Sequence, residues 1–138
     1  MAKTSVLRFT HYTVEDIRFR SVQVSEDKHE FELHPHFKRD LMEVGEHLYD
    51  LKFTMEILSS EKQQIPFDLI VSLTGHFALE DDEVVSENQK ETILKNNTVA
   101  ILFPFLRAIV ASITTAANIP PLVLPVMNFA DDSNEESD

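Results

Sequence analysis

Three histidines with two glutamates between them form the densest group of potential metal ligands in the sequence. The stretch HEFELHPHF carries His29, His34 and His36 together with Glu30 and Glu32. His34 and His36 would share one face of an extended strand, where imidazole nitrogens can bind zinc. A structural zinc site needs about four ligands, and no further ligand stands in register with this pair. We therefore expect solvated strand histidines and predict no metal site and no cofactor.

Short motifs for nucleophilic or phosphate chemistry are also missing from the sequence. It contains no HExxH metalloprotease motif, no nucleophile elbow and no glycine-rich phosphate loop. With only two glycines, a backbone cradle for phosphate is nearly excluded. The carboxylate-rich stretch EDDE, residues 80–83, is typical of a solvated surface. We predict that the protein is not an enzyme.

Charge and composition narrow the possible partners and the cell compartment. Asp and Glu number 24 against 12 Lys plus Arg, which gives a formal net charge of -12 at pH 7. Such a surface repels phosphate groups, so we expect neither nucleic acid nor an anionic membrane as a partner. The chain has no cysteine, and its N-terminal AKTSVLR has no apolar signal core. These features favour a cytoplasmic protein.

The 138 residues suit one domain, and 43% hydrophobic residues are enough for a sizeable core. We predict a single domain over residues 1–130 and an acidic, disordered tail over residues 131–138. No charged residue stands between Ala108 and Met127. However, prolines from Pro120 onward limit the helix after Arg107 to about twelve residues, and a membrane span needs about 20. We predict no membrane insertion.

Alternating apolar and polar residues predict strands in the first half of the chain. Residues 49–57 and 67–79 alternate with period two, which is the pattern of half-buried strands. Residues 31–37 form a shorter candidate, in which Pro35 indicates a strand end or an edge. Residues 6–24 predict a first strand that is irregular near Ser21. Arg39 to Leu48 is expected to be a connection that carries unusually apolar side chains.

Two helices are predicted in the second half of the chain. Ser86 and Gln89 have capping-box spacing for a short helix that ends near Lys95, before Asn96 and Asn97. A second helix is expected from about Phe103 to Ala117, with Pro104 in its first turn. Strands followed by helices predict an α+β fold, in which a helical layer covers the apolar face of an antiparallel sheet.

The second helix is apolar nearly all round, so one sheet covers only one of its sides. Either the proline-rich segment after it folds back over the other side, or the helix lies at a subunit interface. The sequence favours self-association. The predicted oligomer-interface residues are Ile101, Phe105, Leu106, Ile109, Val110 and Ile113.

The segment from Ile101 to Phe129 resembles the corresponding segment of SecB, the bacterial export chaperone family. It carries ILFP, then an aromatic residue and an arginine two residues later, and at its end a proline, an asparagine and a phenylalanine. These are residues 101–104 followed by Phe105, Arg107, Pro120, Asn128 and Phe129. Weaker similarity covers YTVEDIRF, residues 12–19, and GHFAL, residues 75–79.

The resemblance implies four antiparallel strands backed by helices, assembled as a homotetramer, a dimer of dimers with the long helix at its centre. It also implies an ATP-independent holdase that binds unfolded or precursor polypeptides in apolar grooves for protein export. From the loop-like Arg39 to Leu48 segment and the family's client site, we predict a groove beside the helical layer. Its residues are Phe31, Leu33, Phe37, Leu41, Met42, Phe77 and Phe129.

Two departures from the family pattern concern the translocation motor SecA. On the polar face of the sheet, Arg20 and Ile70 stand where the family has carboxylates, which leaves Asp16 and its neighbour Glu15 as possible docking residues. The acidic end of the chain is also too short for the amphipathic helix that follows in the family. SecA coupling is therefore doubtful. The alternatives are a SecB-like chaperone dedicated to one client, such as an antitoxin, and an oligomerisation module without chaperone activity.

Overall fold

The computed structural model describes residues 6–24, 33–62, 64–80 and 86–119. Four strands come first: β1 (Val6–Ser21), β2 (His36–Gly45), β3 (Leu48–Ile57) and β4 (Phe67–Glu80). They are followed by α1 (Glu87–Thr92), a π-helical turn η1 (Ile93–Asn97) and α2 (Thr98–Ala116). The predicted order of strands and then helices is confirmed. His29, Glu30, Phe31, Glu32, Phe129 and the predicted tail 131–138 lie outside the described residues.

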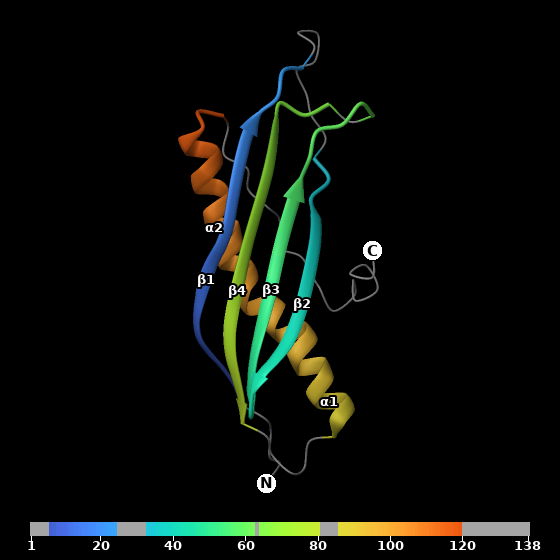
Figure 1. The fold of residues 1–138 in the computed structure, drawn as a ribbon, viewed down its shortest axis with the longest axis vertical. Helices are drawn as coiled ribbons and strands as arrows, with labels where there is room; N and C mark the ends of the chain where they lie inside the picture. The colour runs from blue at the N-terminus through green and yellow to red at the C-terminus, as the bar shows by residue number, and fades with distance from the viewer. Residues whose placement is uncertain (1–5, 25–32, 63, 81–85, 120–138) are drawn as a thin grey trace.

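The strands form one antiparallel sheet in the order β1-β4-β3-β2, so β1 and β2 are its edges. The helical layer crosses one face of this sheet diagonally (Figure 1). It runs from the β2 side at α1 to the β1 side at the end of α2. The fold class predicted from the sequence is therefore confirmed. The opposite, outer face of the sheet is not covered by any described helix.

The core lies between α2 and the two central strands. Every second residue of β3 from Tyr49 to Ile57 is at most 5% exposed, as the alternation predicted. Leu69 and Leu73 of β4 and Leu102 and Leu106 of α2 are fully buried between the sheet and the helix. Gly75 lies close under α2, because a Cβ atom there would be 2.8 Å from the Leu102 side chain and 2.7 Å from the Phe77 ring. A side chain at this position would push the two layers apart.

β2 differs from the sequence prediction. The segment from Arg39 onward was expected to be a connection, but β2 continues to Gly45 and a two-residue turn at Glu46 and His47 joins it to β3. His47 has φ 60°, which closes this short turn. The charged Arg39 at a helix-facing position hides the strand periodicity, and this explains why the pattern resembles a loop.

β1 contains two irregularities, between Phe9 and His11 and between Val14 and Asp16. Each shifts the phase of the strand by one residue, so apolar residues return to the helix-facing side after each shift. The predicted break near Ser21 is the end of the strand. The bulges themselves lie further upstream than the sequence indicated.

The capping box of Ser86 and Gln89 is present, as predicted. The asparagine pair does not interrupt the helix, because η1 accommodates it as a wider turn and the chain continues into α2. Pro104 therefore lies inside a helix that begins well before it, and its predicted place in the first turn is wrong. Ala100, whose carbonyl would accept the missing N–H, and Pro104 are both exposed, so water can bond that carbonyl.

The helix from Glu87 to Ala116 is long and apolar enough to cross a membrane by length and composition. It is much longer than predicted, so its length gives no argument against a membrane span. Its packing does, because Leu102, Leu106 and Val110 are fully buried against the sheet of the same chain. This burial is typical of the core helix of a globular domain.

Candidate functional site

Three of the predicted client-binding residues lie on the helix-facing side of the sheet, next to the β2 edge. Leu33, Phe37 and Leu41 are half-buried and pack against the core. The Phe37 ring stacks on Phe53, with centroids 5.6 Å apart, and meets Phe103 of α2 edge-on at 6.1 Å. We call the strip formed by the half-buried Phe37, Arg39 and Leu41 with the buried Phe103 of α2 and the exposed Lys95 of η1 the β2 seam.

The other two predicted client-binding residues that the structure describes do not line this strip. Phe77 is only 2% exposed and belongs to the core. Met42 is 48% exposed but points to the outer face, where it pairs in register with Asp50. Leu41 and Met42 therefore cannot line one groove, and the prediction that both do so is wrong. Strand geometry is the reason, since successive side chains of β2 alternate between faces.

A polar contact crosses the β2 seam. Arg39 pairs in register with the buried Phe53, so it lies on the helix-facing side of β2. Its Nη1 donates a hydrogen bond of 3.3 Å to the carbonyl oxygen of Lys95 in η1. The Lys95 ammonium bonds Glu91 at 2.8 Å, and this hydrogen bond and the positive charge lower the pKa of the exposed Glu91 carboxyl. Residue 39 thus ties the edge strand to the π-helical turn.

The predicted interface residues divide into two groups. Leu106 and Val110 are fully buried against the sheet of their own chain, so they cannot contact a partner subunit in this fold. The remaining four are partly exposed and line the side of α2 away from β2: Ile101, Phe105, Ile109 and Ile113. One face of the helix thus contributes to the protomer core, while Ile101, Ile109 and Ile113 pack against the rim of that core and form a more open side together with Phe105. The predicted interface on this side stays a prediction.

Phe105 connects that open side to β1. Its ring lies 5.5 Å from Phe9 and 4.9 Å from Tyr12, measured between centroids. Further along the same side of β1, Val14 and Ile17 are each 45% exposed. We call the six partly exposed residues of this region the β1–α2 surface: Val14, Ile17, Ile101, Phe105, Ile109 and Ile113.

The outer face of the sheet is polar and its charges are largely paired. Asp16 lies 2.9 Å from Arg18, and Lys38 lies 3.4 Å from Glu56. His76 bonds Asp50 through Nδ1 and Thr13 through Nε2, both at 2.9 Å. A hollow of about 430 Å³ on this face is lined by Asp16, Arg18, Lys38, Arg39, Asp40, Lys52, Thr54, Glu56, Ile70 and Ser72. Three cations, Arg18, Lys38 and Lys52, balance three carboxylates in this lining, because the Arg39 guanidinium is bonded on the helix-facing side. The hollow is therefore not acidic, in contrast to the chain as a whole.

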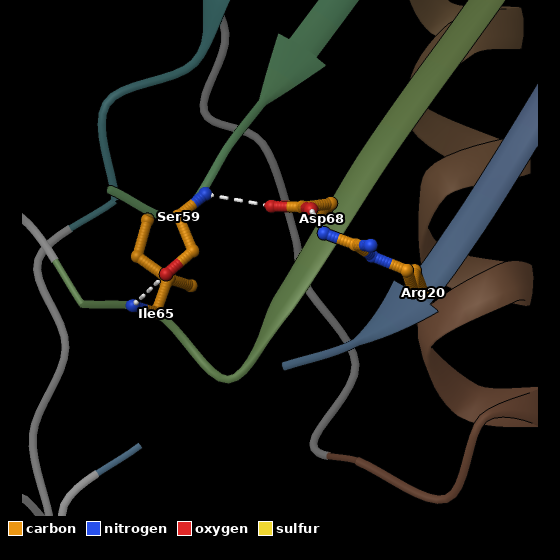
Figure 2. Close-up of polar contacts among 4 residues, drawn as sticks. All are labelled: Arg20, Ser59, Ile65 and Asp68. Atoms are coloured by element: carbon orange, nitrogen blue, oxygen red, sulfur yellow. Dashed lines mark hydrogen bonds and ion pairs between the residues drawn. The ribbon is translucent and has the colours of Figure 1, made fainter. Parts of the chain in front are cut away.

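Arg20 and Asp68 form an ion pair at the end of this face (Figure 2). Arg20 Nη2 lies 3.0 Å from Asp68 Oδ2, while Asp68 Oδ1 accepts a 2.7 Å hydrogen bond from the Ser59 backbone N–H. The Ser59 hydroxyl in turn accepts a hydrogen bond from the Ile65 N–H. Arg20 thus contacts the carboxylate that organises the β3–β4 connection. Glu15, at the second irregularity of β1, is exposed.

The structure describes only part of the HEFELHPHF stretch, for which the sequence predicts no metal site. His34 and His36 are both exposed, and His29 lies outside the described ranges. Within residues 6–24, 33–62, 64–80 and 86–119, no three His, Cys, Asp or Glu side chains are grouped so as to hold a metal ion.

A family model described as preprotein translocase subunit SecB matches residues 3–132, which is nearly the whole chain. The chain belongs to the SecB family. An uncharacterized protein of Methanocaldococcus jannaschii, MJ0357, is 31% identical over 127 residues, which cover 90% of this chain and 80% of that protein. The protein-export protein SecB of Anaplasma phagocytophilum is 34% identical over 83 residues, 60% of this chain and 52% of that protein. The SecB of Maricaulis maris is 30% identical over 87 residues, 63% and 49% respectively. The chain thus spans about half the length of the SecB proteins it matches.

A solved structure with the same fold is the SecB-like chaperone Rv1957 of Mycobacterium tuberculosis. It has a TM-score of 0.70 and 11% sequence identity, and the match covers 88% of this chain and 90% of that one. In that structure the chaperone is in complex with a ChAD peptide from the antitoxin HigA1. At this identity the likeness establishes the fold alone.

Sequence reasoning missed the polar group at the β2 seam, which consists of Arg39 and the turn that it contacts. A signal was present, because Arg39 stands between Phe37 and Leu41 at the phase of the apolar residues. Read as a strand, the segment places one charged side chain among apolar neighbours, and such a residue needs a partner across the seam.

Proposed function

We propose that this SecB family member is an ATP-independent chaperone that binds unfolded or precursor polypeptides. The observation that carries the proposal is the family match over residues 3–132, combined with half-buried apolar side chains on both sides of the helical layer. Unfolded chains expose apolar side chains and unpaired backbone groups, so a holdase needs partly open apolar strips beside strand edges. The cytoplasm is the expected compartment.

The β2 seam is the proposed client site. Phe37 and Leu41 are partly exposed there, and β2, an edge of the sheet among the described strands, runs beside them. Leu33 precedes β2 on the same side and extends the site. Core residues such as Phe77 and outer-face residues such as Met42 no longer belong to it.

The β1–α2 surface is the proposed subunit interface. Its occupant is a second copy of this chain, because β1 is a sheet edge and the apolar side chains of α2 continue directly from it. Burying Val14, Ile17 and Phe105 in a homotetramer would remove the most exposed apolar residues on this side of the molecule. Several client strips on one assembly would then hold a long client through effective concentration.

A role dedicated to one client, such as an antitoxin, is the second candidate. The outer face favours it, since Arg20 is paired with Asp68 and the hollow on this face is not acidic. A motor that docks on carboxylates would find few unpaired ones there. The antitoxin peptide bound to the chaperone of M. tuberculosis illustrates such a role in a protein of the same fold. Saturable binding of purified SecA at physiological salt would favour the export role instead.

A holdase assay tests the proposed function. Reduced α-lactalbumin is an unfolded client that aggregates. We expect the purified protein to suppress this aggregation without added nucleotide, at near-stoichiometric tetramer concentrations. If the protein forms tetramers but does not change the light scattering of the client, it is an oligomerisation module and the chaperone proposal is wrong.

A further inference from the structure

Arg107 is the single charged side chain of α2, and it is half-buried. Its guanidinium lies over the Phe103 ring, 6.0 Å from the ring centroid. Within the described part of the chain, this guanidinium forms no ion pair and no hydrogen bond. A partly desolvated guanidinium gains from an anionic partner, and its N–H groups match the two oxygens of a carboxylate.

Helical geometry places Arg107 on the side of α2 that faces β2. Residues two positions apart on an α-helix point in directions about 200° apart. Phe105 and Ile109 flank Arg107 at this spacing, and both belong to the β1–α2 surface. Arg107 therefore lies on the other side of the helix, one turn after Phe103, which meets Phe37 of β2 edge-on. The half-exposed guanidinium thus borders the β2 seam and not the proposed subunit interface.

The charge around this part of the seam is positive. Arg39 lies two residues from Phe37 on the same face of β2, and its hydrogen bond to a backbone carbonyl leaves its charge in place. Glu43 also faces the helices, but it is six residues from Phe37, about 20 Å along an extended strand. Glu91 is already paired with a lysine of η1. The contact between Phe37 and Phe103 is therefore flanked by two arginines, in a chain whose net charge is -12.

We propose that Arg107 binds a carboxylate of the client, so that the β2 seam prefers apolar client segments in which Asp or Glu stands beside the residue packed on Phe37. The inference rests on the proposed function and names the chemical class of segment that the client site takes. A guanidinium held over an aromatic ring can bind both carboxylate oxygens at once. The net charge repels acidic clients at long range, but salt screens this repulsion over about 8 Å, whereas a partly buried pair is screened less.

The test compares two forms of one unfolded probe, fluorescently labelled and reduced α-lactalbumin. Alkylation with iodoacetate puts a carboxylate on each cysteine of the probe, whereas iodoacetamide puts a neutral amide of nearly the same size there. Anisotropy at physiological salt gives the dissociation constant of each form. Their ratio, taken on one protein variant, cancels any general loss of client affinity.

Arg107→Gln removes the proposed carboxylate partner. The matched control is Arg18→Gln, which changes the net charge equally at a side chain that is 73% exposed on the outer face. We expect Arg107→Gln to weaken binding of the carboxylate form about fivefold relative to the amide form, the upper range for a partly exposed ion pair. Arg18→Gln should leave the ratio unchanged.

Arg107→Lys keeps the charge and loses the planar fork, so it should retain part of the preference for the carboxylate form. Circular dichroism and light scattering show whether each variant is folded and assembled. If Arg107→Gln does not fold, the comparison of Arg107→Lys with wild type decides, and an unchanged ratio overturns the inference.

The outcomes separate this inference from the proposed function. If wild-type protein binds neither form of the probe, the chaperone proposal fails and takes the inference with it. If wild-type protein binds both forms and Arg107→Gln shifts the ratio no more than Arg18→Gln, the chaperone proposal stands and the inference is overturned. Dissociation of the assembly by Arg107→Gln alone also contradicts the inference, because the guanidinium would then belong to a subunit interface.

Discussion

Leu41 and Met42 are consecutive residues that point to opposite faces of the sheet. Leu41 pairs in register with Leu51, which is 1% exposed in the core, whereas Met42 pairs with Asp50 on the polar face. A client lying along the helix-facing side of β2 can therefore touch the first residue and not the second. This relationship fixes the side of the sheet on which the proposed client site lies.

Substitutions at these two positions should have different effects. Leu41→Ser removes apolar contact area from the β2 seam and from the core, so we expect weaker binding of unfolded α-lactalbumin and a loss of about 1–2 kcal/mol of stability. Met42→Ser lies on the outer face and should change stability by less than about 0.5 kcal/mol. Anisotropy and thermal melts measure both. Equal losses of client affinity in the two variants would place the site elsewhere.

Ile109 tests the subunit interface. It is half-buried at the edge of its own core and partly exposed on the β1–α2 surface, so assembly would complete the burial of an unpaired carboxylate in Ile109→Asp. We expect dissociation to smaller, folded species by light scattering, while circular dichroism stays unchanged. The control is Ser112→Asp, at an exposed position of the same helix. A wild-type protein that is monomeric at micromolar concentration would rule out the tetramer.

Pro104 lies in the interior of α2, where proline lacks a donor and its ring crowds the carbonyl of Ala100. Pro104→Ala should restore the missing helical hydrogen bond and stabilise the protein, by about 1 kcal/mol after the more flexible unfolded chain is considered. Chemical denaturation measures the change. A destabilised variant would instead mean that the proline shapes the helix for packing or assembly.

The Arg20–Asp68 pair makes separate predictions for its two members. The Arg20 side chain is 78% exposed, so Arg20→Ala should cost less than about 1 kcal/mol. Asp68→Ala should cost more, about 1–3 kcal/mol, because the Ser59 N–H loses its acceptor as well. Urea denaturation of both variants and of wild type gives the comparison. If Arg20→Ala cost more than Asp68→Ala, the ion pair would contribute more to stability than the hydrogen bond between Asp68 and the Ser59 N–H.

The sequence predicted the central strands well because each has one polar and one apolar side. β3 and β4 pack under α2, and their alternating residues are buried as the pattern indicated. The resemblance around ILFP identified the family correctly. β2 was missed because Arg39 occupies an apolar phase, and its partner, the Lys95 carbonyl, belongs to a helix 56 residues away.

Two other differences depend on tertiary structure. An all-round apolar helix does not indicate which side faces its own sheet, so Leu106 and Val110 could not be separated from Phe105 and Ile109 by sequence. The position of Pro104 depended on where the helix begins, and the π-helical turn at Asn96 moved that beginning far upstream.

Site-specific cross-linking most directly tests the claim that unfolded chains bind on the helix-facing side of β2. A photoreactive benzoyl-phenylalanine at position 37 or at position 42 is irradiated with reduced, unfolded α-lactalbumin in the absence of nucleotide. The account predicts strong cross-links from position 37, which lies in the β2 seam, and few from position 42 on the outer face. Cross-links that come mainly from position 42, or that are equally absent from both, would contradict it.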